Sequence, residues 1–253
     1  MEQEEKKRPK ATAELAKEYD ALRKKMKECR KAGNKVPDEL YKRMYEMWDQ
    51  YDWLNIVFTD PETGKMGVKD VAGRILIPAR YDDIPCVTSY VYAHTMPQAV
   101  KRDGKYGIVA ADGSGKELSE FRFDDADWEA NTNLYFAQWD GDKEHYGFID
   151  ASGKVVCPNI LTDFSEVDLN DIIFIESHGK QGVIDASTHL CVLPEYDDVE
   201  SFVDDFIVFH KDGKEGYITN EGEFVTREQY EKDEKYDKVH FLNCMAKGCR
   251  RVK

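Results

Sequence analysis

Pairs of aspartates recur along this chain, and their type and spacing could do chemistry. The pairs are Asp82/Asp83, Asp124/Asp125 and Asp197/Asp198, with Asp163 and Asp237 as single acids. Two neighbouring carboxylates can hold Ca²⁺ or act as an acid and a base. They can also stabilise turns, in which an Asp side chain accepts a backbone N–H two residues on. Recurrence favours the turn role, because a catalytic pair is needed only once, but the six paired aspartates remain candidate binding residues.

Two tryptophans, Trp128 and Trp139, are further candidate binding residues. They flank the apolar run Leu134-Tyr135-Phe136, where an aromatic side chain either packs in the core or serves as an exposed binding anchor. Core packing is the favoured role.

Nothing in the sequence predicts catalysis or a cofactor. The six histidines, His94, His145, His178, His189, His210 and His240, form no HxH or HExxH motif. A zinc site would therefore require assembly across distant segments. The chain has no P-loop, GxSxG or GxGxxG motif, and Asp112-Gly113-Ser114-Gly115 reads as a hairpin loop. We expect no catalytic residues, no metal site, no cofactor and no enzymatic activity.

The six cysteines indicate free thiols. They show no CxxC spacing, and Cys157 and Cys191 replace apolar residues at equivalent points of two similar segments. Buried free thiols are favoured over metal or redox roles.

The candidate residues lie on a repeated β unit, seen most clearly over residues 173–193. Three short strands are predicted at Ile172–Ile175, Gly182–Asp185 and His189–Leu193, the last stopped by Pro194 because proline removes a ladder donor. A copy follows over residues 206–225. The glycines that open the second strands, Gly67, Gly107, Gly147, Gly182 and Gly216, are spaced by 40, 40, 35 and 34 residues. Such a period is typical of repeat architectures.

Two turns recur in the unit. A Gly-Lys turn precedes the second strand, and a second turn follows it, in which a glycine such as Gly153 takes positive φ at no steric cost. Thr188 interrupts that pattern in the fourth copy, so its second turn must differ.

The unit resembles the WG repeat family, also called KWG repeats. Residues 146–158, YGFIDASGKVVCP, match the family pattern almost throughout, and Tyr81-Asp82 and Tyr196-Asp197 match its Tyr-Asp element. The family's tryptophan is replaced by Met66, Tyr106, Tyr146, Gln181 and Glu215. The resemblance covers about four fifths of the chain, and it implies a bacterial β-repeat protein without implying any chemistry.

Charge is distributed unevenly. The net charge is −14, with +2 on residues 1–55 and −16 on residues 56–253. A domain this acidic repels nucleic acid and attracts basic partners. No apolar run approaches a membrane span, and the first ten residues lack the apolar stretch of a secretory signal, so a cytoplasmic protein is expected.

The apolar pattern of the first 53 residues predicts a helical hairpin. One apolar stripe consists of Leu15, Tyr19, Leu22, Met26 and Cys29. A second consists of Leu40, Met44, Met47/Trp48 and Tyr51, with Gly33-Asn34 between the two. Pro37 is expected in the first turn of the second helix. The hairpin should dock on the β domain or mediate self-association.

These observations predict a mainly β protein. Residues 1–53 form the helical hairpin, and residues 54–253 form an array of three-stranded antiparallel WG-type repeats, propeller-like or curved, beginning with a strand at Leu54–Phe58. A part-repeat at each end favours a closed ring over an open array.

The favoured function is a non-catalytic protein-interaction module that binds a basic protein, for example as an immunity or adaptor protein, without binding nucleic acid or a membrane. The alternative is a carbohydrate-binding or hydrolytic protein with its site on an acidic rim formed by the Asp pairs.

Overall fold

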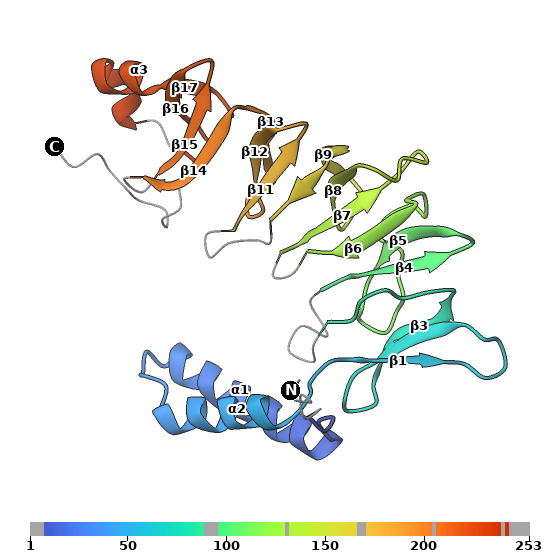
Figure 1. Ribbon diagram of the computed structural model, residues 1–253. Helices are drawn as coiled ribbons and strands as arrows, with labels where there is room; N and C mark the ends of the chain where they lie inside the picture. Colours follow the sequence, from blue (N-terminus) through green and yellow to red (C-terminus); the bar gives the residue numbers. More distant parts are fainter. Residues whose placement is uncertain are drawn as a thin grey trace, which may run out of the picture. The chain divides into compact units, whose positions relative to one another are not determined.

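The computed structural model describes residues 8–88, 96–129, 132–165, 171–203, 206–238 and 241–242. The chain divides into two compact units, residues 1–118 and 119–253. Small antiparallel sheets occur in both units (Figure 1), and strands outweigh helices over the chain as a whole, which confirms the predicted mainly β fold with N-terminal helices. No described helix is both long enough and apolar enough to span a bilayer.

The first unit holds the helical hairpin and two sheets. Its elements are α1 (Ala13–Lys31), α2 (Asp38–Gln50), β1 (Ile56–Thr59), β2 (Met66–Lys69), β3 (Ile75–Tyr81), β4 (Gln98–Arg102) and β5 (Lys105–Val109). Strands β1, β2 and β3 form one sheet in sequential order, and β4 and β5 form a two-stranded sheet.

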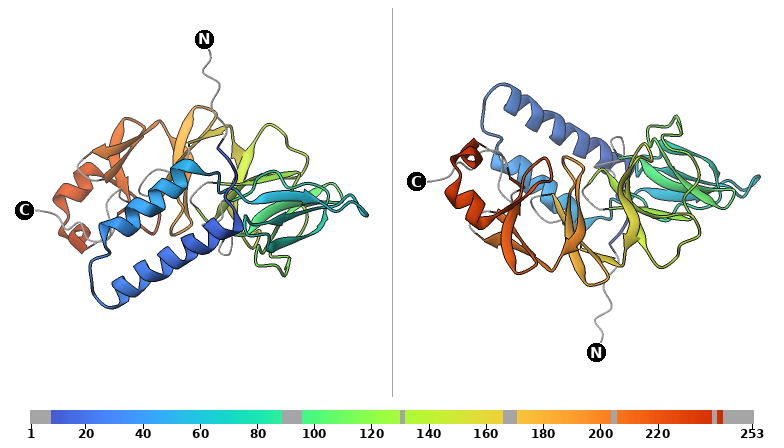
Figure 2. Two further views of the ribbon diagram at one scale, coloured as in Figure 1. Left: turned by 90° about the horizontal axis from the view of Figure 1, so that it is seen from below. Right: turned by 90° about the horizontal axis from the view of Figure 1, so that it is seen from above.

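The helical hairpin packs on the start of the β region. Helices α1 and α2 lie side by side (Figure 2), joined by the ion pair of Arg43 with Glu18. Their apolar face shares a core with Trp53 and Val71, and the Trp53 indole N–H donates to the Met47 carbonyl at 3.0 Å. The expected docking on the β domain is therefore observed.

Two details at the hairpin differ from expectation. Pro37 is the N-cap of α2 and lies outside its first turn, with an extended ψ of 137°. The first strand begins at Ile56, because Trp53 turns inward while Leu54 is 48% exposed.

The second unit contains three four-stranded sheets with the same strand order. Its elements are β6 (Asp125–Trp128), β7 (Leu134–Gln138), β8 (Tyr146–Asp150), β9 (Val155–Leu161), β10 (Asp163–Phe164), β11 (Ile172–Ser177), β12 (Lys180–Asp185), β13 (Leu190–Tyr196), β14 (Asp198–Val203), β15 (Phe206–Lys211), β16 (Lys214–Ile218), β17 (Phe224–Thr226), α3 (Arg227–Lys232) and the 3₁₀ helix η2 (Glu234–Lys238). The sheets are β6–β9, β10–β13 and β14–β17, each in sequential antiparallel order.

These sheets have four strands where three were expected. The extra strand is the stretch directly after the position of the Tyr-Asp element, which reads Phe123-Asp124, Leu161-Thr162 and Tyr196-Asp197 in the three sheets. It pairs with the first strand of the next copy. Each copy thus supplies an edge strand to its successor, and this is how neighbouring repeats are joined.

The five glycines lie on the second strands, as predicted, and a close backbone approach explains four of them. A Cβ on Gly182 would lie 2.3 Å from the carbonyl oxygen of Val192 on the neighbouring third strand. The same backbone oxygen approaches Gly67, Gly147 and Gly216 at 2.4–2.7 Å. At Gly67, Gly147 and Gly182 the third strand bulges over the glycine, so no side chain has room there.

The prediction that Pro194 ends its strand is wrong. Strand β13 continues through Pro194 to Tyr196, because the proline sits in the bulge between the Val183–Val192 and Gln181–Tyr196 pairs. A bulged residue makes no ladder hydrogen bond, so the missing N–H costs nothing there.

Turn geometry follows the sequence closely. Asp103-Gly104, His178-Gly179 and Asp212-Gly213 all have positive φ at both residues, as two-residue type I′ hairpins require. Gly153 has the predicted positive φ of 79°. In the fourth copy His189 takes that conformation, with φ of 60°, so the turn near Thr188 does differ.

The C-terminal region departs from a purely β prediction. Helix α3 begins after Thr226, whose side chain forms a capping box with Gln229. The expected strands of residues 239–252 lie outside the described residues except for Phe241 and Leu242, which contact the last sheet through the Leu242 N–H to the Ile218 carbonyl.

The close backbone approach at the bulge predicts how a substitution of Gly182 changes stability. Gly182→Ala should destabilise the protein by about 3 kcal/mol, because its methyl group meets backbone that no rotamer change can move. The matched variant is Gly179→Ala, where φ is 75° but the space is open, so only the left-handed strain of about 1–2 kcal/mol applies. Urea unfolding followed by circular dichroism would compare them, and equal losses would contradict the close approach.

Candidate functional site

The first aspartate of each pair binds the hairpin of the following copy. Asp82 Oδ2 accepts from the Asp103 N–H at 2.7 Å, Asp124 Oδ2 from the Gly141 N–H at 2.8 Å, and Asp197 Oδ2 from the Asp212 N–H at 2.9 Å. The partner is therefore a turn in the next copy, and not an amide two residues on. These three carboxylates tie neighbouring copies together.

Two of these aspartates also contact lysines. Lys65 hydrogen-bonds to Asp82, and Lys180 hydrogen-bonds to Asp197. Each lysine, helped by the hairpin amide, lowers the pKa of its aspartate below the usual value. Both carboxylates are consequently held in their charged form.

The second aspartate, or the single Asp163, occupies one register position in four copies, but its cross-strand partner changes. Each side chain of a pair accepts the next residue's N–H, at 2.9 Å for Asp83 and 3.0 Å for Asp125 and Asp198. The directly opposed pairs are Asp83–Lys101, Asp125–Gln138, Asp163–Glu176 and Asp198–His210. This position is acidic throughout and carries a different chemistry in each copy.

The two tryptophans make packing contacts. Trp139 lies edge-on to Phe123, with ring centroids 6.0 Å apart, and its ring covers Gly147. The Trp128 indole N–H donates to the Thr132 carbonyl at 2.8 Å. Both side chains are half-buried, and neither lines the pocket described next.

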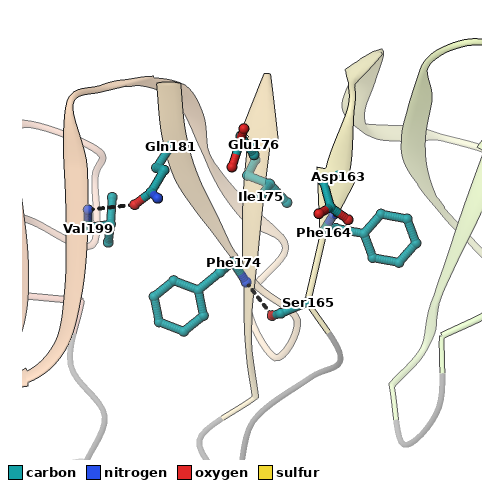
Figure 3. Close-up of a pocket in the computed structure, with 8 residues that line it drawn as sticks. All are labelled: Asp163, Phe164, Ser165, Phe174, Ile175, Glu176, Gln181 and Val199. Carbon is teal, nitrogen blue, oxygen red and sulfur yellow. Dashed lines mark hydrogen bonds between the residues drawn. The ribbon is translucent and has the colours of Figure 1, made fainter. Parts of the chain in front are cut away.

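A pocket of about 320 Å³ lies between the β10–β13 sheet and β14. Its lining residues are Asp163, Phe164, Ser165, Phe174, Ile175, Glu176, Gln181 and Val199. Figure 3 shows Phe174 and Gln181 on the side of Val199, whereas Phe164 points away from it. Phe164 instead joins an aromatic cluster with Phe136, Tyr146 and Phe148.

The pocket has an acidic wall and an aromatic wall. Asp163 and Glu176 are directly opposed on β10 and β11, so two carboxylates share one face of the sheet. Phe174 is two residues before Glu176 on the same strand and the same face. Gln181 is held in place because its side-chain oxygen accepts the Val199 N–H at 2.8 Å.

This arrangement is suited to a cation. Like charges directly opposite each other on a sheet are destabilising, and a bound cation relieves that repulsion. An arginine side chain offers a planar donor fork for carboxylates and stacks on aromatic rings. The pocket therefore has the chemistry to accept a basic side chain.

None of the eight residues proposed from the sequence lines this pocket. Asp163 stands out in the sequence as a single acid, Phe174 belongs to the predicted buried strand Ile172–Ile175, and Glu176 has no predicted role. The signal that could have found them is the charged Glu176 that ends the apolar run Ile172–Ile175.

The four described cysteines are free thiols, as expected from the sequence, but only Cys157 is fully buried, whereas Cys29, Cys86 and Cys191 are half-buried. Cys157 and Cys191 lie on the third strands β9 and β13, belong to one apolar core and are free thiols. A hydrogen bond with Cys191, together with burial, raises the pKa of Cys157.

The sheets, glycines and Tyr-Asp elements define a β-repeat protein. The family model described as WG containing repeat matches residues 182–214, from the Gly182 strand to the start of β16. The chain thus carries a repeat of the WG family, and the resemblance predicted from the sequence is confirmed.

The other comparisons add little. Among solved structures, the chain is similar to one described as Kluyveromyces lactis Hsv2 complete loop 6CD, with 12% identity, a TM-score of 0.35 and coverage of 63% of this chain and 55% of that one. A second, described as the eukaryotic initiation factor, has 11% identity, a TM-score of 0.31 and coverage of 63% and 49%. The chain spans about half the length of each. No curated protein matches.

The stabilisation from the hydrogen bond between the Asp197 carboxylate and the Asp212 N–H should depend on pH. The folded pKa of Asp197 lies below the ordinary 3.8, so its contribution to stability is present above that value and is lost as pH falls through the folded pKa. Asp197→Asn should lower Tm by a few degrees at pH 7, and the difference from wild type should shrink toward pH 3.

Asp125→Asn is the control, because Asp125 contacts the adjacent Ala126 N–H rather than a hairpin of the next copy. It should leave Tm nearly unchanged. A Tm difference for Asp197→Asn that is the same at both pH values would contradict the role assigned to the charged carboxylate.

Proposed function

We propose that this protein is a non-catalytic interaction module that binds a basic segment of a partner protein through the pocket between β10–β13 and β14. The observation that carries the proposal is the opposed pair Asp163–Glu176 beside Phe174 in the pocket, where the described residues give neither carboxylate an ion pair and Asp163 accepts only the adjacent Phe164 N–H. The partner inserts an arginine or lysine side chain there.

Long-range charge supports the same partner. The region from residue 56 onward has a net charge of −16, which attracts a basic surface and speeds its association. An immunity or adaptor protein acting in the cytoplasm, where free thiols are kept reduced, would use this binding mode.

The alternative, a sugar-binding or hydrolytic site on the rim of Asp pairs, has less support. In three pairs, one carboxylate oxygen of the first aspartate already accepts a hairpin N–H of the next copy; these are Asp82, Asp124 and Asp197. A side chain fixed in this way in three copies serves the repeat architecture, and nothing in its surroundings favours a sugar.

The proposal can be tested with a defined probe. A labelled Gly/Ser peptide with three spaced arginines should bind the full chain, and the same peptide with citrulline should not, because citrulline keeps the shape but loses the charge. The double variant Asp163→Asn/Glu176→Gln should bind the arginine peptide about tenfold more weakly in fluorescence anisotropy, since charged hydrogen bonds are lost.

The matched control is Glu221→Gln/Glu223→Gln, which removes the same charge from two exposed residues between β16 and β17. It should leave affinity nearly unchanged, and EDTA should have no effect on any of the variants. Equal weakening by both double variants would show that only net charge matters, and equal binding of the citrulline peptide would contradict the proposal.

Self-association through the N-terminal hairpin is a separate proposal. Two aromatic side chains of α2 face solvent, Tyr45 at 58% and Trp48 at 38% exposed. If they form a contact between copies, Trp48→Lys should convert a dimer to a monomer in light scattering at constant protein concentration. A wild-type monomer at high concentration would refute this.

A further inference from the structure

We propose that Asp198, Glu200 and His210 form a binding site for Zn²⁺ on the sheet β14–β17. Asp198 lies directly opposite His210 in the pairing of β14 with β15, and Glu200 lies two residues further along β14 on the same face. One oxygen or nitrogen from each side chain lies within 4.8 Å of the others. The site does not depend on the function proposed for the pocket.

One ring nitrogen of His210 lacks a hydrogen-bond partner among the described residues. Its Nε2 is shielded from solvent and makes no hydrogen bond among the described residues, although Glu200 Oε1 lies 3.3 Å away. That distance satisfies an ion pair, but the angle does not give a hydrogen bond. A shielded imidazole nitrogen without a partner is costly, and a metal ion would satisfy it.

The surrounding charges leave this group anionic. The next side chain on the same face, Glu215, is opposed to His210 on β16 and is already paired with Arg227 at 2.6 Å. Arg227 forms ion pairs with both Glu215 and Glu231. The carboxylates of Asp198 and Glu200 therefore place two negative charges beside His210.

The ligand set selects the metal. Imidazole nitrogen suits zinc and its neighbours, whereas Ca²⁺ prefers sites made only of oxygen. Zinc binds nitrogen and carboxylate oxygen at about 2.0–2.2 Å, so two of its ligand atoms lie at most about 4.2 Å apart. Asp198 and Glu200 are exposed, and a small rotation of their side chains closes the remaining gap.

The site would have an open position. Three protein ligands on one exposed sheet face leave zinc room for a water molecule or for a group from another molecule. The metal would also join β14 to β15, which are the strands that follow the Tyr196-Asp197 element.

Zinc binding to the full chain tests this directly. Protein stripped with EDTA and kept reduced should bind one equivalent of Zn²⁺ in isothermal titration calorimetry, and Co²⁺ should give the visible absorption of a low-coordinate site. His210→Asn should abolish both signals. His189→Asn is the matched control, because asparagine tolerates the left-handed backbone at residue 189, and it should bind like wild type.

Two further variants separate the outcomes. Glu200→Gln changes a half-exposed side chain and should weaken Zn²⁺ binding even if His210→Asn fails to fold. Cys191→Ser, which removes a thiol from a different sheet, should leave binding intact. Binding that persists in both His210→Asn and Glu200→Gln, or that disappears in Cys191→Ser, would overturn the site, as would the absence of saturable binding by wild type.

Discussion

The close approach of one backbone to another at the second strand of four repeats is the constraint on which this structure depends. At Gly67, Gly147, Gly182 and Gly216 a carbonyl oxygen of the third strand occupies the place where a side chain would begin. The bulge that brings it there lengthens the third strand locally and carries the chain on to the Tyr-Asp element. Without the glycine, the third strand could not reach the position from which the next copy starts.

Successive copies are joined by the same few interactions. The first aspartate accepts a hairpin amide from the next copy, and the residues after it become that copy's edge strand. The first strand of each copy in the second unit is thus paired on both sides, and the outer strands of each sheet are the added strand and the third strand. Repeats joined in this way are stabilised mainly by their nearest neighbours, as expected of a repeat array.

The sequence predicted what is decided locally. Glycine spacing and turn residues located the second strands, and positive φ at Gly153 followed from turn chemistry alone. The continuation of strand β13 through Pro194 could not be predicted from the sequence. It depends on a bulge, and the bulge is set by the register with the partner strand β12. The pocket was missed for a similar reason: Asp163 and Glu176 are 13 residues apart in sequence, and only strand pairing opposes them.

Function in such a protein is best sought where the copies differ. A feature that recurs between copies, such as the aspartate on its hairpin amide at Asp82, Asp124 and Asp197, belongs to the architecture. The second aspartate faces Lys101 or Gln138 in two copies, and those partners neutralise it or leave it harmless. In the other two copies the partners are Glu176 and His210, which leave negative charge unrelieved. Since unrelieved charge has a folding cost and serves no purpose in the repeat, these two positions are where selection for a ligand would act.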